Sequence, residues 1–274
     1  MKNYKDTAKT PEGAARIDFP SPVDLLPDSP STKTTDETLD ALFSGELKLF
    51  QSRKGYRFSL DALLLAHFVT VKRRERVIDL GTGNGVIPLI LARLHDDISI
   101  AGVEIQPAMV ERAERNIRLN QLAKQIRVHA GDVRAIETIA PAASFAVAVC
   151  NPPYRLASSG RNSPNDEKRI ARHECCGALG DFLSAARFVL RAKGRVALVY
   201  LADRAVELFS AMHAARLEPK RLRMVHSFIG AQAALILVEG IKNGRKGVKI
   251  LPPLIVYRDD KEYSAEVAAI IAGK

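Results

Sequence analysis

Short apolar runs alternate in this chain with longer stretches whose apolar residues recur every three or four positions. The first pattern predicts buried strands, and the second predicts helices that pack one face against a sheet. Strands are expected at residues 77–80, 98–103, 126–129, 145–150, 195–201, 222–228 and 233–240, with helices between most of them. Such an alternation is typical of α/β proteins. We therefore predict an open, mostly parallel sheet covered by helices.

The two ends of the chain depart from this alternation. Residues 1–40 contain five prolines and show no sustained periodicity, which predicts a disordered or loosely packed tail. A short helix is expected over Thr35–Phe43, and residues 41–274 are predicted to form the folded domain. Near its end, Pro252 and Pro253 limit the basic C-terminal extension to an edge strand or a non-strand, and the last residues predict a short helix.

The segment before residue 70 is expected to contain a strand from Leu47, a turn over Arg53–Tyr56 and a helix over Leu60–Val69. Asp61 falls in the first turn of that helix. Its carboxylate can complement the helix dipole there, or it can line a ligand pocket beside a positively charged group. The sequence leaves both roles open.

Three glycines crowd into the turn after the strand at residues 77–80. Gly81, Gly83 and Gly85 precede a predicted helix, and such glycines let a backbone approach a ligand closely. A dinucleotide fingerprint would have its third glycine at position 86, which is Val86 here. Asp79 places a negative charge at the turn. That charge would repel a pyrophosphate but would attract a cationic ligand such as S-adenosylmethionine.

Two more acidic residues follow the next two predicted strands. Glu104 lies about twenty residues beyond the glycines, where a carboxylate can hold the hydroxyls of a ribose. Asp132 follows the strand at residues 126–129 and is placed to accept a hydrogen bond from an adenine amine. It can equally cap a helix that begins at Val133. The two roles of Asp132 are compatible.

A tetrapeptide with a distinct chemistry follows the strand at residues 145–150. It consists of Asn151, Pro152, Pro153 and Tyr154. The carboxyl ends of parallel strands border the ligand crevice, so these residues should face the site that the glycine turn lines. The Asn151 amide oxygen and the Pro152 carbonyl can accept two hydrogen bonds from one NH2 group, while the Tyr154 ring can stack on a planar substrate. This predicts that a planar amine is held for attack on an electrophilic methyl group.

The formal net charge of +10 is unevenly distributed. Residues 1–40 have a net charge of −3, so the remainder has +13, which suggests a polyanionic partner such as nucleic acid. Six basic residues in a long polar loop and near a later turn are candidates for phosphate contacts, although both segments can also be merely solvated: Arg155, Lys168, Arg172, Lys242, Arg245 and Lys246.

Other features make several classes less favourable. No apolar run approaches the ~18 residues of a membrane span, and the N-terminus lacks the apolar core of a signal peptide. The three cysteines provide neither a disulfide framework nor a C-x-x-C metal pair, because Cys175 and Cys176 are adjacent. We expect a reduced cytoplasmic protein without a metal or a membrane anchor.

Together these motifs resemble those of class I S-adenosylmethionine-dependent methyltransferases. The resemblance rests on DLGTGNG at residues 79–85, Glu104, Asp132 and Asn151–Tyr154, in that order. The segments GYRFSLDALLLAHF and VEGIKNGRKGVKILPPLIVY are similar, more narrowly, to bacterial tRNA1(Val) adenine-N6-methyltransferases. The resemblance implies a Rossmann-like fold, with a doubly wound, mostly parallel seven-stranded sheet and an antiparallel edge strand.

The same resemblance implies roles for the site residues. The glycine turn, including Asn84, would hold the amino-acid end of S-adenosylmethionine, Glu104 its ribose and Asp132 its adenine. Asn151, Pro152 and Tyr154 would present the target amine.

The expected reaction is methylation of N6 of an adenine in RNA, with tRNA as the first candidate. Protein glutamine N5-methylation, rRNA or DNA adenine-N6 methylation, and a non-catalytic RNA-binding module stay open, as does the oligomeric state.

Overall fold

The apolar runs of the sequence form the strands of one central sheet. The computed structural model describes residues 34–53, 60–153, 177–258 and 262–274. The long strands of this sheet are β3 (Arg76–Leu80), β4 (Ser99–Glu104), β5 (Ile126–Ala130), β6 (Phe145–Cys150), β7 (Leu190–Leu201), β8 (Leu217–His226) and β9 (Ala233–Lys242). Two short strands, β10 (Lys249–Ile250) and β11 (Leu254–Ile255), pair with β8 and extend the sheet.

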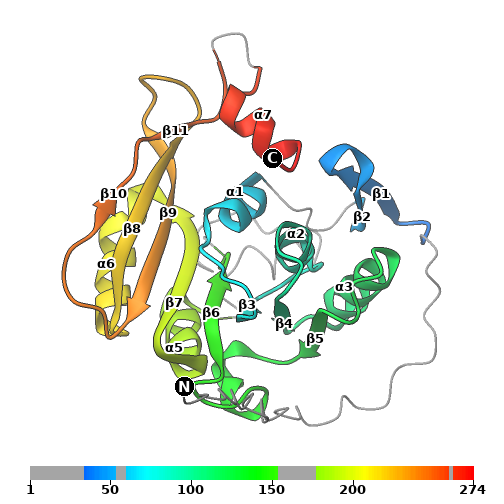
Figure 1. Ribbon diagram of the computed structural model, residues 1–274, viewed down its shortest axis with the longest axis horizontal. Coiled ribbons are helices and arrows are strands. Elements are labelled where there is room, and N and C mark those ends of the chain that lie inside the picture. The colour runs from blue at the N-terminus through cyan, green and yellow to red at the C-terminus, as the bar shows by residue number, and fades with distance from the viewer. Residues whose placement is uncertain (1–33, 54–59, 154–176, 259–261) are drawn as a thin grey trace, which may run out of the picture.

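Helices cover both faces of this sheet (Figure 1). They are α1 (Leu60–Phe68), α2 (Val86–Leu94), α3 (Pro107–Leu119), α5 (Leu179–Val189), α6 (Ala205–Ala214) and α7 (Ala265–Ile271), with short 3-10 helices at η2 (Val133–Thr138) and η4 (Ala202–Arg204). One apolar core joins the sheet to α1, α2 and α7, and the other joins it to η2, α5 and α6. The fold is therefore doubly wound, as expected.

Strand order places the antiparallel strand inside the sheet. The order is β10-β8-β9-β7-β6-β3-β4-β5, and β9 is antiparallel to both β7 and β8. The prediction of an antiparallel strand at the edge was therefore wrong in position. Five consecutive residues of β9 are buried, whereas most of β8 is only half-buried. An interior place suits β9, because its buried backbone needs hydrogen-bond partners on both sides, and β7 and β8 supply them.

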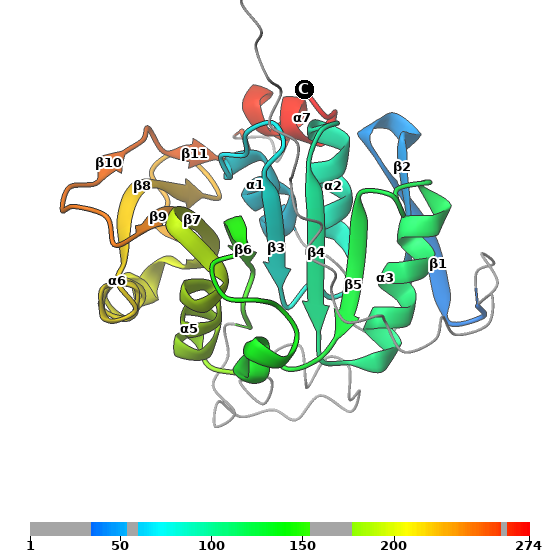
Figure 2. The same ribbon diagram turned by 60° about the horizontal axis from the view of Figure 1, so that its bottom comes forward.

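A separate hairpin precedes the sheet. Its strands are β1 (Glu37–Leu42) and β2 (Leu47–Ser52), joined through a turn at Phe43–Gly45. The helix expected over Thr35–Phe43 was therefore wrong, whereas the strand from Leu47 is confirmed. The hairpin lies beside α3, as two views of the molecule agree (Figures 1 and 2).

Buried polar groups fix the hairpin to α3. Glu37 is almost fully buried and pairs with the guanidinium groups of Arg112 and Arg115, which hold the pKa of its carboxyl at about 2 against the effect of burial. The Asn116 and Asn120 amides bond the backbone of β2. The strand at residues 37–42 is thus fixed by a buried charge and not by apolar burial: Glu37 points inward to the two arginines, whereas the apolar Leu39 is half exposed.

The C-terminal extension wraps the outer edge of the sheet. Its two-residue strands β10 and β11 pair in parallel with β8, which confirms that this segment contributes only edge structure. Helix α7 then packs near α1, confirming the expected terminal helix. Among the described residues, every helix is too short or too polar to cross a membrane.

Candidate active site

The glycine turn connects β3 to α2 at the carboxyl edge of the sheet. Gly81, Gly83 and Gly85 all have positive φ angles, of 77°, 57° and 82°. A side chain at Gly85 would place its Cβ 3.2 Å from the Cβ of Ala113 in α3. Glycine is therefore required at this position both for its backbone angle and for the close approach of α3.

Glu104, at the end of β4, is fixed across this turn. Its carboxylate accepts the Gly83 N–H at 2.9 Å and the Gln106 N–H at 2.9 Å. Burial raises the pKa of Glu104, and these backbone hydrogen bonds offset part of that rise. Each carboxylate oxygen can accept a second hydrogen bond, so the group keeps capacity for a ligand hydroxyl.

Asp79 is the most isolated charge of the site. It is fully buried, and among the described residues neither of its carboxylate oxygens has a hydrogen-bond partner. Burial raises its pKa to about 7. The nearby Thr82 side chain offsets part of this rise, although its hydroxyl makes no hydrogen bond of normal geometry within the described part of the chain, and the Glu104 charge adds to it. A buried carboxylate without a partner is costly, and a positively charged ligand group would remove that cost. This geometry fits the cationic ligand that the sequence predicts.

Asn84 also turns unused polar atoms inward. Its side chain is 1 % exposed, and neither amide atom has a partner among the described residues. Its backbone carbonyl accepts the Nδ2 group of Asn116 at 3.0 Å. Asn116 also bonds the N–H and C=O of Phe50, so it ties the hairpin to the glycine turn.

Sequence reasoning missed Asn116. Its signal was an asparagine among the inward-facing positions of a predicted helix, where this residue is unfavourable without a specific partner.

Asp132 follows β5 at the same edge of the sheet. It caps η2, with its Oδ1 accepting the Arg134 N–H at 2.9 Å, which confirms the capping role. The Arg134 guanidinium lies against the same carboxylate and lowers its pKa. Contact with an adenine amine stays a prediction.

The Asn-Pro-Pro segment begins directly after β6. Cys150, the last residue of β6, is in register with Leu80 of β3 and with Leu198 of β7. This places Asn151 and Pro152 next to the glycine turn, and Pro152 is buried. Tyr154 lies outside the described residues, as do Arg155, Lys168 and Arg172.

Asp61 lies in the first turn of α1 and is half-buried. Helix α1 packs against α2, the helix that starts at the glycine turn. Its role toward a ligand stays a prediction.

The structure does not bring the remaining basic candidates to this site. Lys242 ends β9, and because β9 is antiparallel, Lys242 pairs with Leu217 at the beginning of β8. Arg245 and Lys246 follow it. These three residues therefore lie at the opposite edge of the sheet. Within the described ranges, no three metal-ligand side chains gather as a metal ion would need.

Comparisons with known proteins agree with this geometry. Residues 59–215 match the family model described as the methyltransferase small domain. A tRNA1(Val) (adenine(37)-N6)-methyltransferase of Tolumonas auensis is 28% identical over 224 residues, which cover 80% of this chain and 90% of that protein. One from Yersinia pestis is 34% identical over 103 residues, 37% of this chain and 41% of that protein.

A solved structure supports the fold. The crystal structure of a predicted O-methyltransferase from Agrobacterium tumefaciens superposes with a TM-score of 0.64 at 24% identity, over 78% of this chain and 96% of that one. The family model covers the glycine turn, Glu104, Asp132 and the Asn-Pro-Pro segment. This chain belongs to the methyltransferase small domain family and is an S-adenosylmethionine-dependent methyltransferase.

Proposed function

We propose that this enzyme methylates N6 of an adenine in tRNA. The relatives reported above support the substrate, because their names specify adenine N6 at position 37 of tRNA1(Val). The chain spans nine-tenths of the Tolumonas auensis relative, so the match extends well beyond the cofactor-binding half. We infer the cytoplasm as the place of action, because a tRNA substrate is found there.

One observation carries the proposal: the Asn-Pro-Pro segment and the unpartnered Asp79 meet at neighbouring strand ends. Asp79 in β3 is in register with Val149, two residues before Asn151. A cationic cofactor group held near Asp79 would therefore lie within reach of an amine held by Asn151.

The proposed mechanism needs only positioning by the chain. S-adenosylmethionine supplies a methyl group that its positive sulfur makes electrophilic. The Asn151 amide oxygen and the Pro152 carbonyl accept hydrogen bonds from the adenine NH2 and hold its nitrogen in line with that methyl group. As the N–C bond forms and the C–S bond breaks, the nitrogen becomes positive, and both acceptors stabilise that charge before the proton leaves to water. Tyr154 would stack on the base.

The target adenine must leave its stack to reach Asn151. A loop nucleotide is already partly unstacked, so it costs less to extrude than a paired base.

A methyl-transfer assay tests the proposal. Purified protein is supplied with tritium-labelled S-adenosylmethionine and, separately, with total tRNA, ribosomal RNA and a peptide-release factor. The expected result is label in tRNA that digests to N6-methyladenosine. Label in the release factor alone would replace the proposal by glutamine methylation, because a carboxamide is also a planar amine. Cofactor binding without transfer to any of them would favour a binding module.

A further inference from the structure

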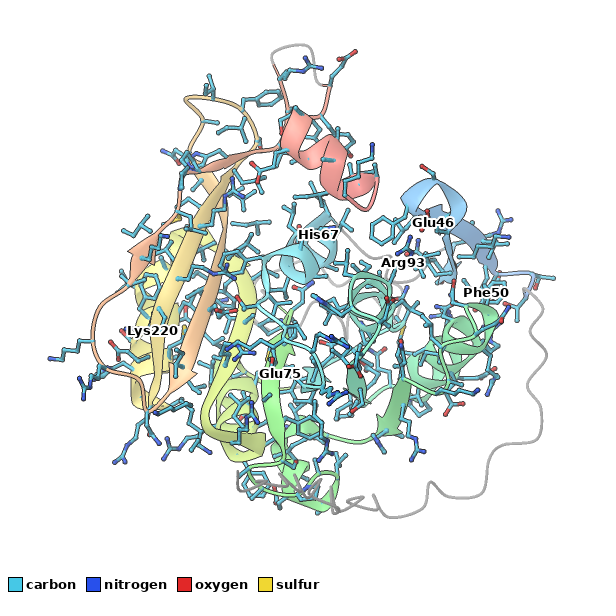
Figure 3. All side chains as sticks on the ribbon, viewed as in Figure 1. Glu46, Phe50, His67, Glu75, Arg93 and Lys220 are labelled. Atoms are coloured by element: carbon cyan, nitrogen blue, oxygen red, sulfur yellow. The ribbon has the colours of Figure 1, made fainter. Side chains whose placement is uncertain are left out.

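Six cations gather at the end of the sheet where the parallel strands begin, opposite the active site at their carboxyl ends. We call this group the basic edge; its members are Arg187, Arg216, Lys220, Lys242, Arg245 and Lys246. They come from the end of α5, the beginning of β8 and the end of β9 with the loop that follows it. Figure 3 labels Lys220, which lies on the far side of the molecule from Phe50 in the hairpin, and shows other side chains with nitrogen ends around it.

Neutral backbone oxygens, rather than carboxylates, hold the half-buried members of this group, as Lys220 and Lys242 show. The Lys220 ammonium donates to the carbonyls of Arg245 at 2.8 Å and Gly247 at 2.6 Å. Lys242 donates to the carbonyl of Leu190 at 2.6 Å. The backbone of the loop is tied down as well, because the Asn243 N–H bonds the carbonyl of Arg216 at 2.8 Å. The loop after β9 is thus held by Lys220 of β8 and by the backbone of Arg216.

The cations of the basic edge are not ion-paired in the part of the chain that the structure describes. Among the described residues, none of the six lies within ion-pair distance of a carboxylate, and Glu218, the acid between Arg216 and Lys220, pairs with His213 instead. The pKa of Lys242 is lowered, first by burial and then by the nearby Arg187 charge.

Other arginines of the chain differ in this respect. Arg195 pairs with Glu75, and Arg223 pairs with Glu266. Crowded like charges without counterions are unfavourable, and a bound polyanion would relieve them.

The distance between the active site and the basic edge determines how long an RNA must be to contact both. Cys150 is in register with Leu198 of β7, whereas the end of β9 lies beyond Arg195, which pairs with Ile241. The beginning of β8, which pairs with the end of β9, lies four residues along the strand direction and three strand spacings (β6 to β7, β9 and β8) from Cys150. These correspond to about 13 Å and about 14 Å, hence on the order of 20 Å in all. Stacked nucleotides rise by about 3.4 Å each, so roughly six are needed to span it.

We propose that the basic edge binds phosphates of the RNA substrate, roughly six or more nucleotides away from the adenine at Asn151. Arg216, Arg245 and Lys246 are exposed and make these contacts, while Lys220 holds the loop in place. Phosphate contacts of this kind fix position and register without reading sequence. The enzyme therefore recognises a structured RNA by the distance between its target adenine and a second group of phosphates, as well as by the adenine itself. This inference rests on the proposed function.

The test removes the three exposed charges together. Arg216→Gln/Arg245→Gln/Lys246→Gln is compared with a control variant, Arg118→Gln/Lys124→Gln/Arg127→Gln, which removes three exposed charges at the β5 end of the sheet. A third variant, Arg216→Lys/Arg245→Lys/Lys246→Arg, keeps all charges. Methyl-transfer kinetics use a full-length tRNA transcript, and filter binding uses the same tRNA between 50 and 200 mM salt. A seven-nucleotide RNA with the adenine at its centre is the short probe.

We expect the first variant to raise KM for tRNA about tenfold and to reduce the slope of log affinity against log salt by about two to three. Its kcat and its KM for S-adenosylmethionine stay at the wild-type values, and its affinity for the seven-nucleotide RNA is unchanged. The charge-keeping variant behaves like the wild type, which excludes a folding defect as the cause.

Two results would overturn the inference. One is a KM for tRNA within twofold of that of the control variant; the other is an equal loss of affinity for the short RNA. Both leave the proposed function intact as long as the wild type methylates tRNA. Absence of methylation by the wild type would instead contradict the proposed function itself.

Discussion

The two ends of the strands in the central sheet carry charges of opposite sign that form no ion pairs among the described residues. At the carboxyl edge the charges are acidic and buried, with Asp79 and Glu104 as the main examples. At the basic edge they are cationic, and half of them are exposed. A buried carboxylate suits a small cationic ligand that is enclosed, whereas exposed cations suit an extended polyanion that stays in solvent. With RNA anchored at the basic edge, as we propose, the two ends of one sheet would separate cofactor binding from substrate anchoring.

The backbone orients the charges at both edges. The glycine turn presents the Gly83 N–H to Glu104, and the loop after β9 presents carbonyl oxygens to Lys220. Neutral partners fix a charged side chain without cancelling its charge. Each edge therefore stays ready for a ligand of the opposite charge.

The largest expected effect comes from the carboxyl edge and concerns Asn151. Asn151→Ala should reduce the rate of methyl transfer by about 10²–10³, because it removes an acceptor that stabilises the developing charge. Single-turnover transfer to tRNA and calorimetric binding of S-adenosylmethionine measure the two properties separately. Cofactor affinity should stay within about twofold of the wild type. If Asn151→Ala lowers transfer and cofactor binding equally, the residue is structural.

Asp79→Asn should weaken S-adenosylmethionine binding by roughly tenfold to a hundredfold, because it removes the buried charge that a cationic ligand neutralises. Equilibrium dialysis at pH 8 measures this effect. For the wild type, affinity should increase as pH rises through about 7, where Asp79 loses its proton. The variant should lack this pH dependence. Unchanged affinity in the variant would remove Asp79 from the cofactor site.

Asp79→Asn should weaken cofactor binding but stabilise the ligand-free protein. The pKa of Asp79 is raised from 3.8 to about 7, so the ligand-free native state binds a proton that the unfolded chain has released. Wild-type stability should therefore fall as pH rises from about 4 to 7. Asp79→Asn should be more stable than the wild type at pH 8, by roughly 1 to 4 kcal/mol, and similar at pH 4. Denaturant unfolding at the two pH values measures the difference, and equal stability at pH 8 would contradict it.

The smallest expected effect lies at the basic edge. Lys220→Met removes the ammonium that holds the carbonyls of Arg245 and Gly247, and should raise KM for tRNA about threefold through a loosened loop. Steady-state kinetics at 100 mM salt check this, with kcat and cofactor KM unchanged. Lys124→Met removes one charge at the β5 end and should have no effect. An equal response of both variants would mean that only net charge matters.

Much of the active site could be predicted from the sequence. Asp79, Glu104 and Asn151 were expected at strand ends, and parallel strands necessarily bring their carboxyl ends to one edge. The glycine spacing indicated a turn, and the structure gives all three glycines the backbone angles that glycine tolerates best. These inferences succeed because they depend on local patterns and on one topological rule.

The hairpin could not be predicted in the same way. Residues 35–43 have no strong periodicity, and two of the apolar side chains of β1, Leu39 and Ala41, are exposed. The strand forms because Glu37 binds Arg112 and Arg115, which are 75 residues or more away in the chain. Asn116 bonds the hairpin at Phe50 and the glycine turn at Asn84, two contacts that are also distant in the sequence.

The sequence by itself determined the chemistry of this protein: which residues end each strand and which ligand charge they suit. Only the tertiary structure decided where the basic residues lie. Lys242, Arg245 and Lys246 follow a strand just as Asn151 does, but β9 runs antiparallel, so its end faces the other way. The short connection between β8 and β9 forces these two strands to be antiparallel. No local pattern in the chain encodes that β9 lies between β7 and β8, and this place brings Lys242 beside the beginnings of both strands.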